Sequence, residues 1–216
     1  MRDAFHRELE VLDQDVVRMG AVVERSAQDA TRAFVECDNA LAQKVREGDE
    51  EIDRIFLDIE KRSLTLLAQQ APVASDLRLI VAILRVVNDL ERTGDLAYNI
   101  AKLVQAEEFC EPGPKAIHSL VSELGHAASN LMSRAIDAWA TKDEALAADL
   151  ARQDDQIDEL HARLIQRLLE LDDQTSVAPA IRLAMVGRYF ERIGDHAVNM
   201  GERIRYFVTG DEEHLG

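Results

Sequence analysis

Four pairs of acidic residues stand out because the two members of each pair are four positions apart. The pairs are Asp49 with Asp53, Glu91 with Asp95, Asp154 with Asp158, and Glu191 with Asp195. In an α-helix this spacing places both carboxylates on one face, where like charges destabilise an isolated helix by about 0.2–0.5 kcal/mol. Carboxylates that converge from two neighbouring helices cannot all ionise without a cation. Hard oxygen donors of this kind suit Mg, Ca, Mn or Fe, so the pairs are candidate metal ligands.

The acid pairs belong to an internal repeat. Residues 91–99 match residues 191–199 at six of nine positions, and residues 49–53 correspond to residues 154–158. Such self-similarity indicates a duplicated structural unit. Glycine lies between the two acids in both Glu-containing pairs, at Gly94 and Gly194. Glycine inside a helix costs roughly 1 kcal/mol against alanine, so its repetition suggests a close backbone approach or room for a ligand.

Residues next to the acids are candidates for supporting roles. Asn99 and Asn199 lie one turn beyond the acids and could add an amide ligand or a supporting hydrogen bond. Arg92 and Arg192 could pair with a neighbouring carboxylate or bind a partner. His196 replaces a leucine of the first copy, so it is a weaker candidate ligand.

The acids also have a simpler interpretation, since a single Asp-x-x-x-Asp on an acidic helix is usually solvated. Two observations favour a site. The spacing is duplicated, and helical periodicity places Glu91 and Asp95 along the apolar stripe of their helix, where we expect burial. Two acid–histidine pairs, Glu123 with His126 and Asp158 with His161, lack a counterpart in the other half. We interpret those two as surface pairs.

The rest of the chain predicts the elements that position the acids. Only 10 of 216 residues are glycine and 4 are proline, while 47% are apolar, which favours long helices over a β-sandwich or barrel. Apolar residues recur every three or four positions in six segments. We predict an all-α fold of two tandem, repeated three-helix antiparallel bundles. The first repeat would span residues 1–108, a linker residues 109–114, and the second repeat residues 115–216.

Charge and composition limit the kinds of molecule that the chain is expected to bind. The net charge of −16 and the absence of a basic block make nucleic acid and anionic membrane poor partners, whereas cations or basic protein surfaces are suitable. There is no run of about 18 apolar residues, so we expect no membrane insertion. Two distant cysteines without a Cys-x-x-Cys motif predict a reduced, cytoplasmic protein.

The duplicated motif resembles the signature of the PhoU family. The resemblance rests on residues 89–101, residues 190–200 and the segment 69–78, Gln-Gln-Ala-Pro-Val-Ala-Ser-Asp-Leu-Arg. It extends over essentially the whole chain. It departs at Thr93, where the family usually has an aliphatic residue, and at Tyr98, which is larger than most residues there.

The resemblance implies a negative regulator of phosphate uptake and of phosphate-starvation signalling. It implies a cytoplasmic scaffold that couples a phosphate ABC transporter, through its ATPase, to a membrane sensor histidine kinase, and that tends to form homodimers. It also implies multinuclear iron or zinc sites on the four acid pairs, with Mg, Mn or Ca as further options from the oxygen donors.

Two other functions remain open from the sequence. A carboxylate-bridged di-metal enzyme would need paired Glu-x-x-His ligands, which the repeats lack. A purely structural helical bundle would leave all the acids solvated. No nucleophile–base arrangement stands out, so we expect a protein without enzymatic activity.

Overall fold

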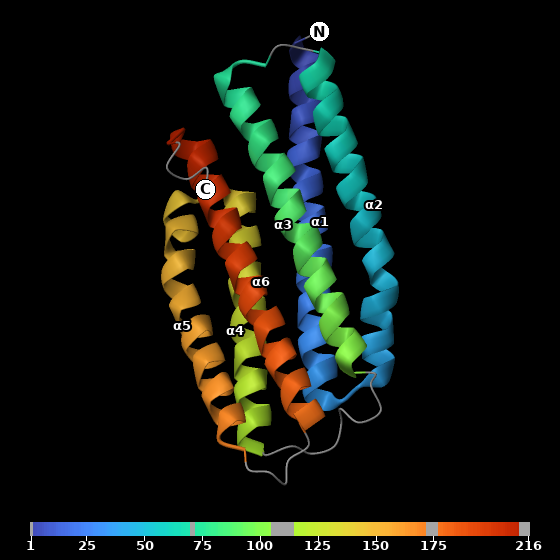
Figure 1. Cartoon of the computed structure of the whole chain (residues 1–216). Helices are drawn as coiled ribbons and strands as arrows, with labels where there is room; N and C mark the ends of the chain where they lie inside the picture. The colour runs from blue at the N-terminus through green and yellow to red at the C-terminus, as the bar shows by residue number, and fades with distance from the viewer. Residues whose placement is uncertain (1, 70–71, 105–114, 172–176, 212–216) are drawn as a thin grey trace.

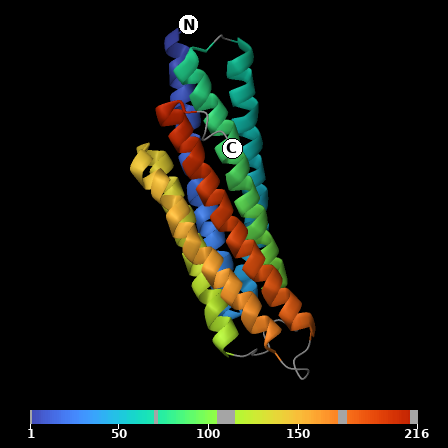
Figure 2. The same ribbon diagram turned by 60° about the vertical axis from the view of Figure 1, so that its left-hand side comes forward.

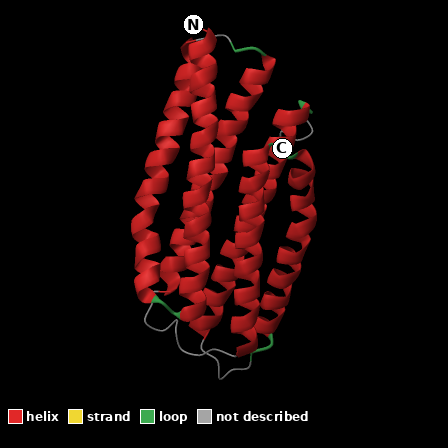
Figure 3. Ribbon diagram, turned by 180° about the vertical axis from the view of Figure 1, so that it is seen from behind, coloured by secondary structure: helices red, strands yellow, loops and turns green. Residues whose placement is uncertain are grey.

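The computed structural model describes residues 2–69, 72–104, 115–171 and 177–211, and all six helices lie within these ranges (Figure 1). The helices are α1 (Arg2–Glu36), α2 (Asn39–Gln69), α3 (Ala74–Val104), α4 (Lys115–Thr141), α5 (Glu144–Leu169) and α6 (Val177–Thr209). In the described part of the chain, helices joined by short loops are the only regular structure (Figure 3). The predicted all-α architecture is therefore confirmed, while the predicted linker 109–114 lies outside the described residues.

The six helices form two three-helix bundles that lie side by side. Helices α1 to α3 make one bundle and α4 to α6 the other, with α3 against α6 and α1 against α4 (Figures 1 and 2). Helix α3 runs down the view of Figure 1 whereas α6 runs up it, so the two repeats are packed in opposite directions. The motif-bearing helices of both repeats therefore meet along the centre of the molecule.

The repeat extends to the loops that start its second helix. Asp38 accepts hydrogen bonds from the backbone N–H groups of Ala40 and Leu41, each at 2.9 Å, and Asp143 accepts one from that of Leu146 at 2.9 Å. These are N-caps, which satisfy free N–H groups of the first turn. The residues before them, Cys37 and Lys142, have φ angles of 53° and 55°. Each repeat therefore changes direction with the same backbone device.

The core consists mainly of aliphatic side chains that the helices bury between them. Phe34 and Trp139 occupy corresponding places near the ends of α1 and α4 and are 0% and 1% exposed.

Over the residues that the structure describes, none of the helices is long and apolar enough to cross a membrane.

Candidate metal centre

Each repeat places its four predicted acids along one helix pair. The first acidic cluster consists of Asp49 and Asp53 on α2 with Glu91 and Asp95 on α3, and the second consists of Asp154 and Asp158 on α5 with Glu191 and Asp195 on α6. In both clusters the first acid of each pair is half-buried and the second is exposed. The prediction that Glu91 and Asp95 lie along the buried stripe is therefore wrong. The two acids lie at its edge, where water can reach them.

The motif glycines allow the two helices of each cluster to approach closely. A Cβ atom added at Gly94 would lie 2.9 Å from Ile52 Cδ1 and 3.7 Å from Asp49 Oδ1. A Cβ atom added at Gly194 would collide with Asp154 Oδ1. At Gly194 the acid of the neighbouring helix lies against the backbone, whereas at Gly94 an added Cβ meets chiefly the end of the Ile52 side chain.

The acids of the first cluster raise one another's pKa values. Burial raises the pKa of Asp49 from 3.8 to about 6, with further contributions from the negative charges of Asp53 and Asp95. Burial and the neighbouring acids also raise the pKa of Glu91 and of Asp95, which the positive charge of Arg92 partly offsets. The charge of Arg92 therefore partly offsets the repulsion among these acids.

The second cluster repeats this pattern more strongly. Burial raises the pKa of Asp154 from 3.8 to about 7, followed by the charges of Asp158, Asp195 and Glu191. The pKa of Glu191 is also raised by burial and Asp195, although Arg188 lowers it in part. At two corresponding positions, burial is the largest cause of the raised carboxyl pKa and the neighbouring acids add to it.

Whether these side chains fit a metal ion can be tested on their geometry. Within the described ranges, no three His, Cys, Asp or Glu side chains already form a group that could hold a metal ion. The acids are neighbours that repel one another rather than a preassembled ligand shell. Two oxygens of the second cluster, Asp154 Oδ1 and Glu191 Oε2, are nevertheless buried without a hydrogen-bond partner. Orphaned buried oxygens, mutual repulsion and an all-carboxylate donor set fit a hard divalent cation.

The two motif asparagines and Arg192 are half-buried. Asn199 Nδ2 donates to Asp89 Oδ1 on α3 at 3.4 Å, so in this structure its amide joins the two repeats rather than the acids of its own cluster. The reason is the close packing of α3 against α6, which brings Asp89 within reach.

The same contact explains the residue that breaks the repeat. His196 Nδ1 lies 3.0 Å from Asp89 Oδ1, and both side chains are 8% exposed. A buried carboxylate requires a partner because its desolvation cost is otherwise uncompensated. His196 therefore has a structural partner across the two repeats. Asp89 was not among the predicted residues, and its place two positions before the motif gave no signal of this pairing.

Two residues beside the second cluster were also missed or misjudged. Arg188 Nη1 donates to Glu191 Oε1, an i, i+3 contact that the sequence could have indicated. His161 is half-buried rather than a surface residue, so the interpretation of Asp158 and His161 as a surface pair is wrong. Burial and the charge of Arg188 lower the pKa of His161 against the opposing effect of Asp158.

Glu123 and His126 are both exposed, as expected of a surface pair.

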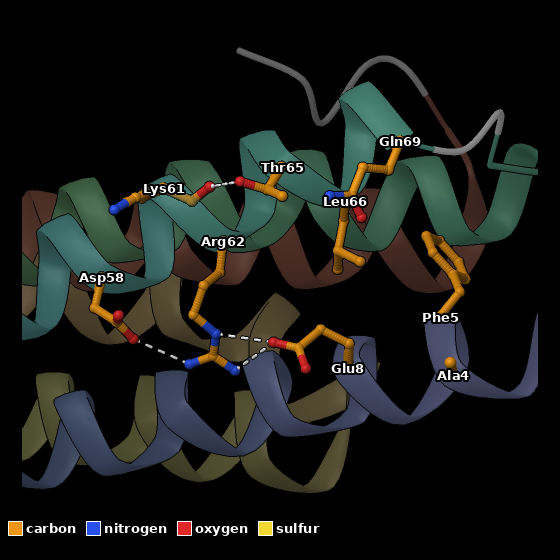
Figure 4. Close-up of a pocket in the computed structure, with 9 residues that line it drawn as sticks. All are labelled: Ala4, Phe5, Glu8, Asp58, Lys61, Arg62, Thr65, Leu66 and Gln69. Carbon is orange, nitrogen blue, oxygen red and sulfur yellow. Dashed lines mark hydrogen bonds and ion pairs between the residues drawn. The ribbon is translucent and has the colours of Figure 1, made fainter. Parts of the chain in front are cut away.

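A separate pocket lies between the start of α1 and the end of α2, away from both clusters (Figure 4). Its central cation, Arg62, pairs with Glu8 at 2.9 Å, Asp15 at 2.7 Å and Asp58 at 3.0 Å. Three carboxylates around one guanidinium hold α1 and α2 together and leave little charge to attract an anion. The pocket therefore adds no functional site to the two clusters.

Comparison with known proteins places these features in a family. The PhoU domain matches the chain twice, over residues 16–104 and 121–204. A Pseudomonas putida protein named "Phosphate-specific transport system accessory protein PhoU homolog" is 38% identical over 98% of this chain and 84% of its own length. A Synechocystis protein of the same name is 33% identical over 98% of this chain and 94% of its own length.

Solved structures agree with the sequence comparison. The crystal structure of PhoU from Pseudomonas aeruginosa superposes with a TM-score of 0.89 at 32% identity, covering 96% of this chain and 100% of that one. The phosphate transport system regulatory protein PhoU from Streptococcus pneumoniae gives a TM-score of 0.87 at 27% identity, covering 96% and 98%. The two matched segments together contain all eight acids of the clusters. The chain belongs to the PhoU family.

Proposed function

We propose that this chain is an accessory and regulatory protein of phosphate transport, and that it is a cytoplasmic scaffold rather than an enzyme. The single observation that carries the proposal is the match of both repeats, acid motifs included, to a family whose curated members bear the name of the phosphate-specific transport system. The more specific proposal is that the chain is a negative regulator. It couples the ATPase of a phosphate ABC transporter to a membrane sensor histidine kinase and keeps phosphate-starvation signalling off when phosphate is plentiful.

We further propose that the two acidic clusters bind divalent metal ions. A bound cation supplies positive charge that offsets the repulsion among the carboxylates. The residues that would hold it are Asp49, Asp53, Glu91 and Asp95 in the first repeat and their counterparts in the second. The raised carboxyl pKa values and the orphaned oxygens of Asp154 and Glu191 support this role.

The acidic surface supports the proposed protein partners. A net charge of −16 favours docking onto basic loops of a transporter or kinase close to the membrane. Such contacts are screened by salt, because the Debye length falls from about 10 Å at 0.1 M to about 3 Å at 1 M. A homodimer is also expected from the family, and light scattering of the purified chain measures it directly.

A deletion strain carrying a phosphate-starvation reporter tests the regulatory claim. Loss of the gene should switch the reporter on in phosphate-rich medium, and the wild-type gene should restore repression. A reporter that stays off after deletion would overturn the claim. Pull-down with the ATPase and with the kinase cytoplasmic domain tests coupling, and failure to bind either one at high and at low phosphate contradicts it.

The metal claim has its own variant and control. Asp95→Ala with Asp195→Ala removes one exposed acid from each cluster, and elemental analysis of the gently purified chain should show a loss of bound metal. Glu10→Ala with Glu159→Ala removes the same charge from exposed positions outside the clusters and should leave the metal content unchanged. Equal metal content in both double variants would contradict the metal sites while leaving the regulatory claim intact.

A further inference from the structure

Each repeat exposes large aliphatic side chains where its second helix ends and its third begins. The exposed positions correspond between the repeats at an offset of 104 or 105 residues. The first apolar end consists of Leu64 (52% exposed), Val73 (52%) and Leu77 (43%), and the second of Leu169 (81%), Val177 (71%) and Ile181 (55%). Because all three positions are exposed in both copies, the exposure is a property of the repeated unit.

The two apolar ends lie at opposite ends of the molecule. Helix α3 begins at the top of Figure 1 and α6 begins at the bottom, because the repeats are packed in opposite directions. Clustered exposed aliphatic side chains are typical of interaction sites. A flat lipid surface would cover one end and leave the other in water, whereas two protein surfaces can cover both.

A groove between α2 and α3 adjoins the first apolar end. It has a volume of about 400 Å³, and Phe56, Leu64, Leu84 and Arg85 are among the residues that line it. Leu77 precedes Leu84 by seven residues, or about two helical turns, so both lie on the same stripe of α3. Leu64 and Leu77 therefore border one surface that is hollowed enough to admit side chains of a partner.

The apolar ends also lack the strong acidity of the rest of the chain. Residues 61–87 contain four basic and one acidic residue, and residues 162–190 contain four basic and three acidic residues, although the whole chain has a net charge of −16. Lys61 and Arg163 are exposed beside the two ends. The centres of protein–protein interfaces are likewise enriched in arginine and depleted in acidic residues. The complementary surface is apolar and carries acidic residues.

We propose that each apolar end docks an apolar, acidic surface of a protein partner, and that one chain bridges the two copies of a symmetric partner dimer. A two-fold dimer presents the same surface twice, which matches two corresponding ends that face in opposite directions. Once one end is bound, the second binds at a high effective concentration. This inference rests on the proposed scaffold role, and it assigns the docking to surfaces outside the acidic clusters.

Calorimetric titration of the full-length chain with the purified transporter ATPase and, separately, with the kinase cytoplasmic domain tests the proposal. The variants replace exposed aliphatic residues by glutamine, which is a good helix former. Leu64→Gln with Leu77→Gln removes the first end, and Leu169→Gln with Ile181→Gln removes the second. Each pair should weaken binding by about tenfold or more, since the second contact is lost, and all four together should abolish it. Val11→Gln alters an aliphatic residue that is 40% exposed on α1 and should change nothing. The thermal midpoint of each variant shows whether it folds.

Charge reversal separates this docking from attraction of the acidic surface to basic loops. Lys61→Glu with Arg163→Glu should weaken binding by about fivefold, because the partner surface is acidic. Attraction to basic loops would leave binding unchanged or make it tighter, and either result overturns the inference. Lys44→Glu makes the same charge change at an exposed position outside both ends and should not weaken binding.

The remaining outcomes identify other occupants or a failure of the scaffold role. If both proteins bind and no glutamine variant weakens either one, the inference is wrong and the proposed coupling stands. If neither protein binds the wild-type chain, the proposed coupling fails and the inference fails with it. A change from dimer to monomer in light scattering of the glutamine variants would assign the ends to contacts between copies of this chain. Co-sedimentation with phosphatidylglycerol vesicles that the same variants lose would assign them to lipid. Either of these two results also overturns the inference.

Discussion

Replacing Asp154 by asparagine should stabilise the metal-free protein at neutral and alkaline pH. The pKa of Asp154 is raised from 3.8 to about 7 by burial and four nearby acids, so above that pH the folded protein must hold an ionised carboxylate that its surroundings disfavour. Each pKa unit corresponds to about 1.4 kcal/mol, which sets an upper bound of roughly 4 kcal/mol. Asp154 is only half-buried, and solvent screening reduces the expected gain to about 1–2 kcal/mol.

The pH dependence of this gain has a definite sign. The pKa of this carboxyl is higher in the folded than in the unfolded state. Its contribution to stability is therefore complete only at pH values below the unfolded-state pKa, and it is lost as the pH rises through the folded-state pKa. The wild-type, metal-free protein should therefore lose stability between about pH 4 and pH 7. Asp154→Asn does not titrate, so its advantage should be full at pH 8 and fall to about a third at pH 5.

Thermal unfolding in a chelator measures the effect. A gain of 1–2 kcal/mol corresponds to about 2–8 °C in the unfolding midpoint of a chain of this size. Glu159→Gln is the matched control, because Glu159 is exposed on the same helix and is not among the acids that raise the pKa of Asp154. An equal shift for both variants, or no shift for Asp154→Asn at pH 8, would refute the reasoning. With a binding metal present the sign should reverse, because the variant loses a ligand.

Two further predictions concern packing and the contact between repeats. Gly194→Ala should destabilise the chain by about 1–3 kcal/mol because its Cβ collides with Asp154 Oδ1. Gly94→Ala should destabilise the chain less, because its Cβ meets an isoleucine methyl at 2.9 Å that can move. Urea unfolding measures the loss of stability in both variants, and equal losses would contradict this structural reason. His196→Leu restores the residue of the first repeat but leaves buried Asp89 without its ring partner, and should cost about 3 kcal/mol. Adding Asp89→Leu should recover part of that loss, and a double variant no more stable than the single one would argue against the pair.

The helices and their caps could be predicted from the sequence because they depend on local patterns. Apolar spacing defines each amphipathic helix, and Asp38 and Asp143 act as caps through hydrogen bonds to residues two or three positions away. The tandem arrangement followed from the internal repeat. These features need no knowledge of which helix packs against which, so periodicity and capping chemistry were sufficient.

The parts that could not be predicted depend on contacts between helices distant in sequence. The pair of Asp89 and His196 joins residues 107 positions apart, and neither residue carries a local mark of the other. His161 was interpreted as a surface residue because its partial burial depends on the approach of α6, where a Cβ atom added at Gly187 would lie 3.4 Å from its ring. The position of Glu91 and Asp95 at the edge of the buried stripe likewise depends on how α2 packs against α3.

Metal binding by the acidic clusters is tested most directly by crystals of the chain grown with Mn²⁺ and, in a second set, with Zn²⁺. Anomalous difference maps at each metal's absorption edge locate the ions without assumptions about the ligands. We predict peaks between α2 and α3, among Asp49, Asp53, Glu91 and Asp95, and between α5 and α6, among the four corresponding acids of the second cluster. Maps with no peak in either cluster at saturating metal, or with peaks only elsewhere on the surface, would contradict the assignment.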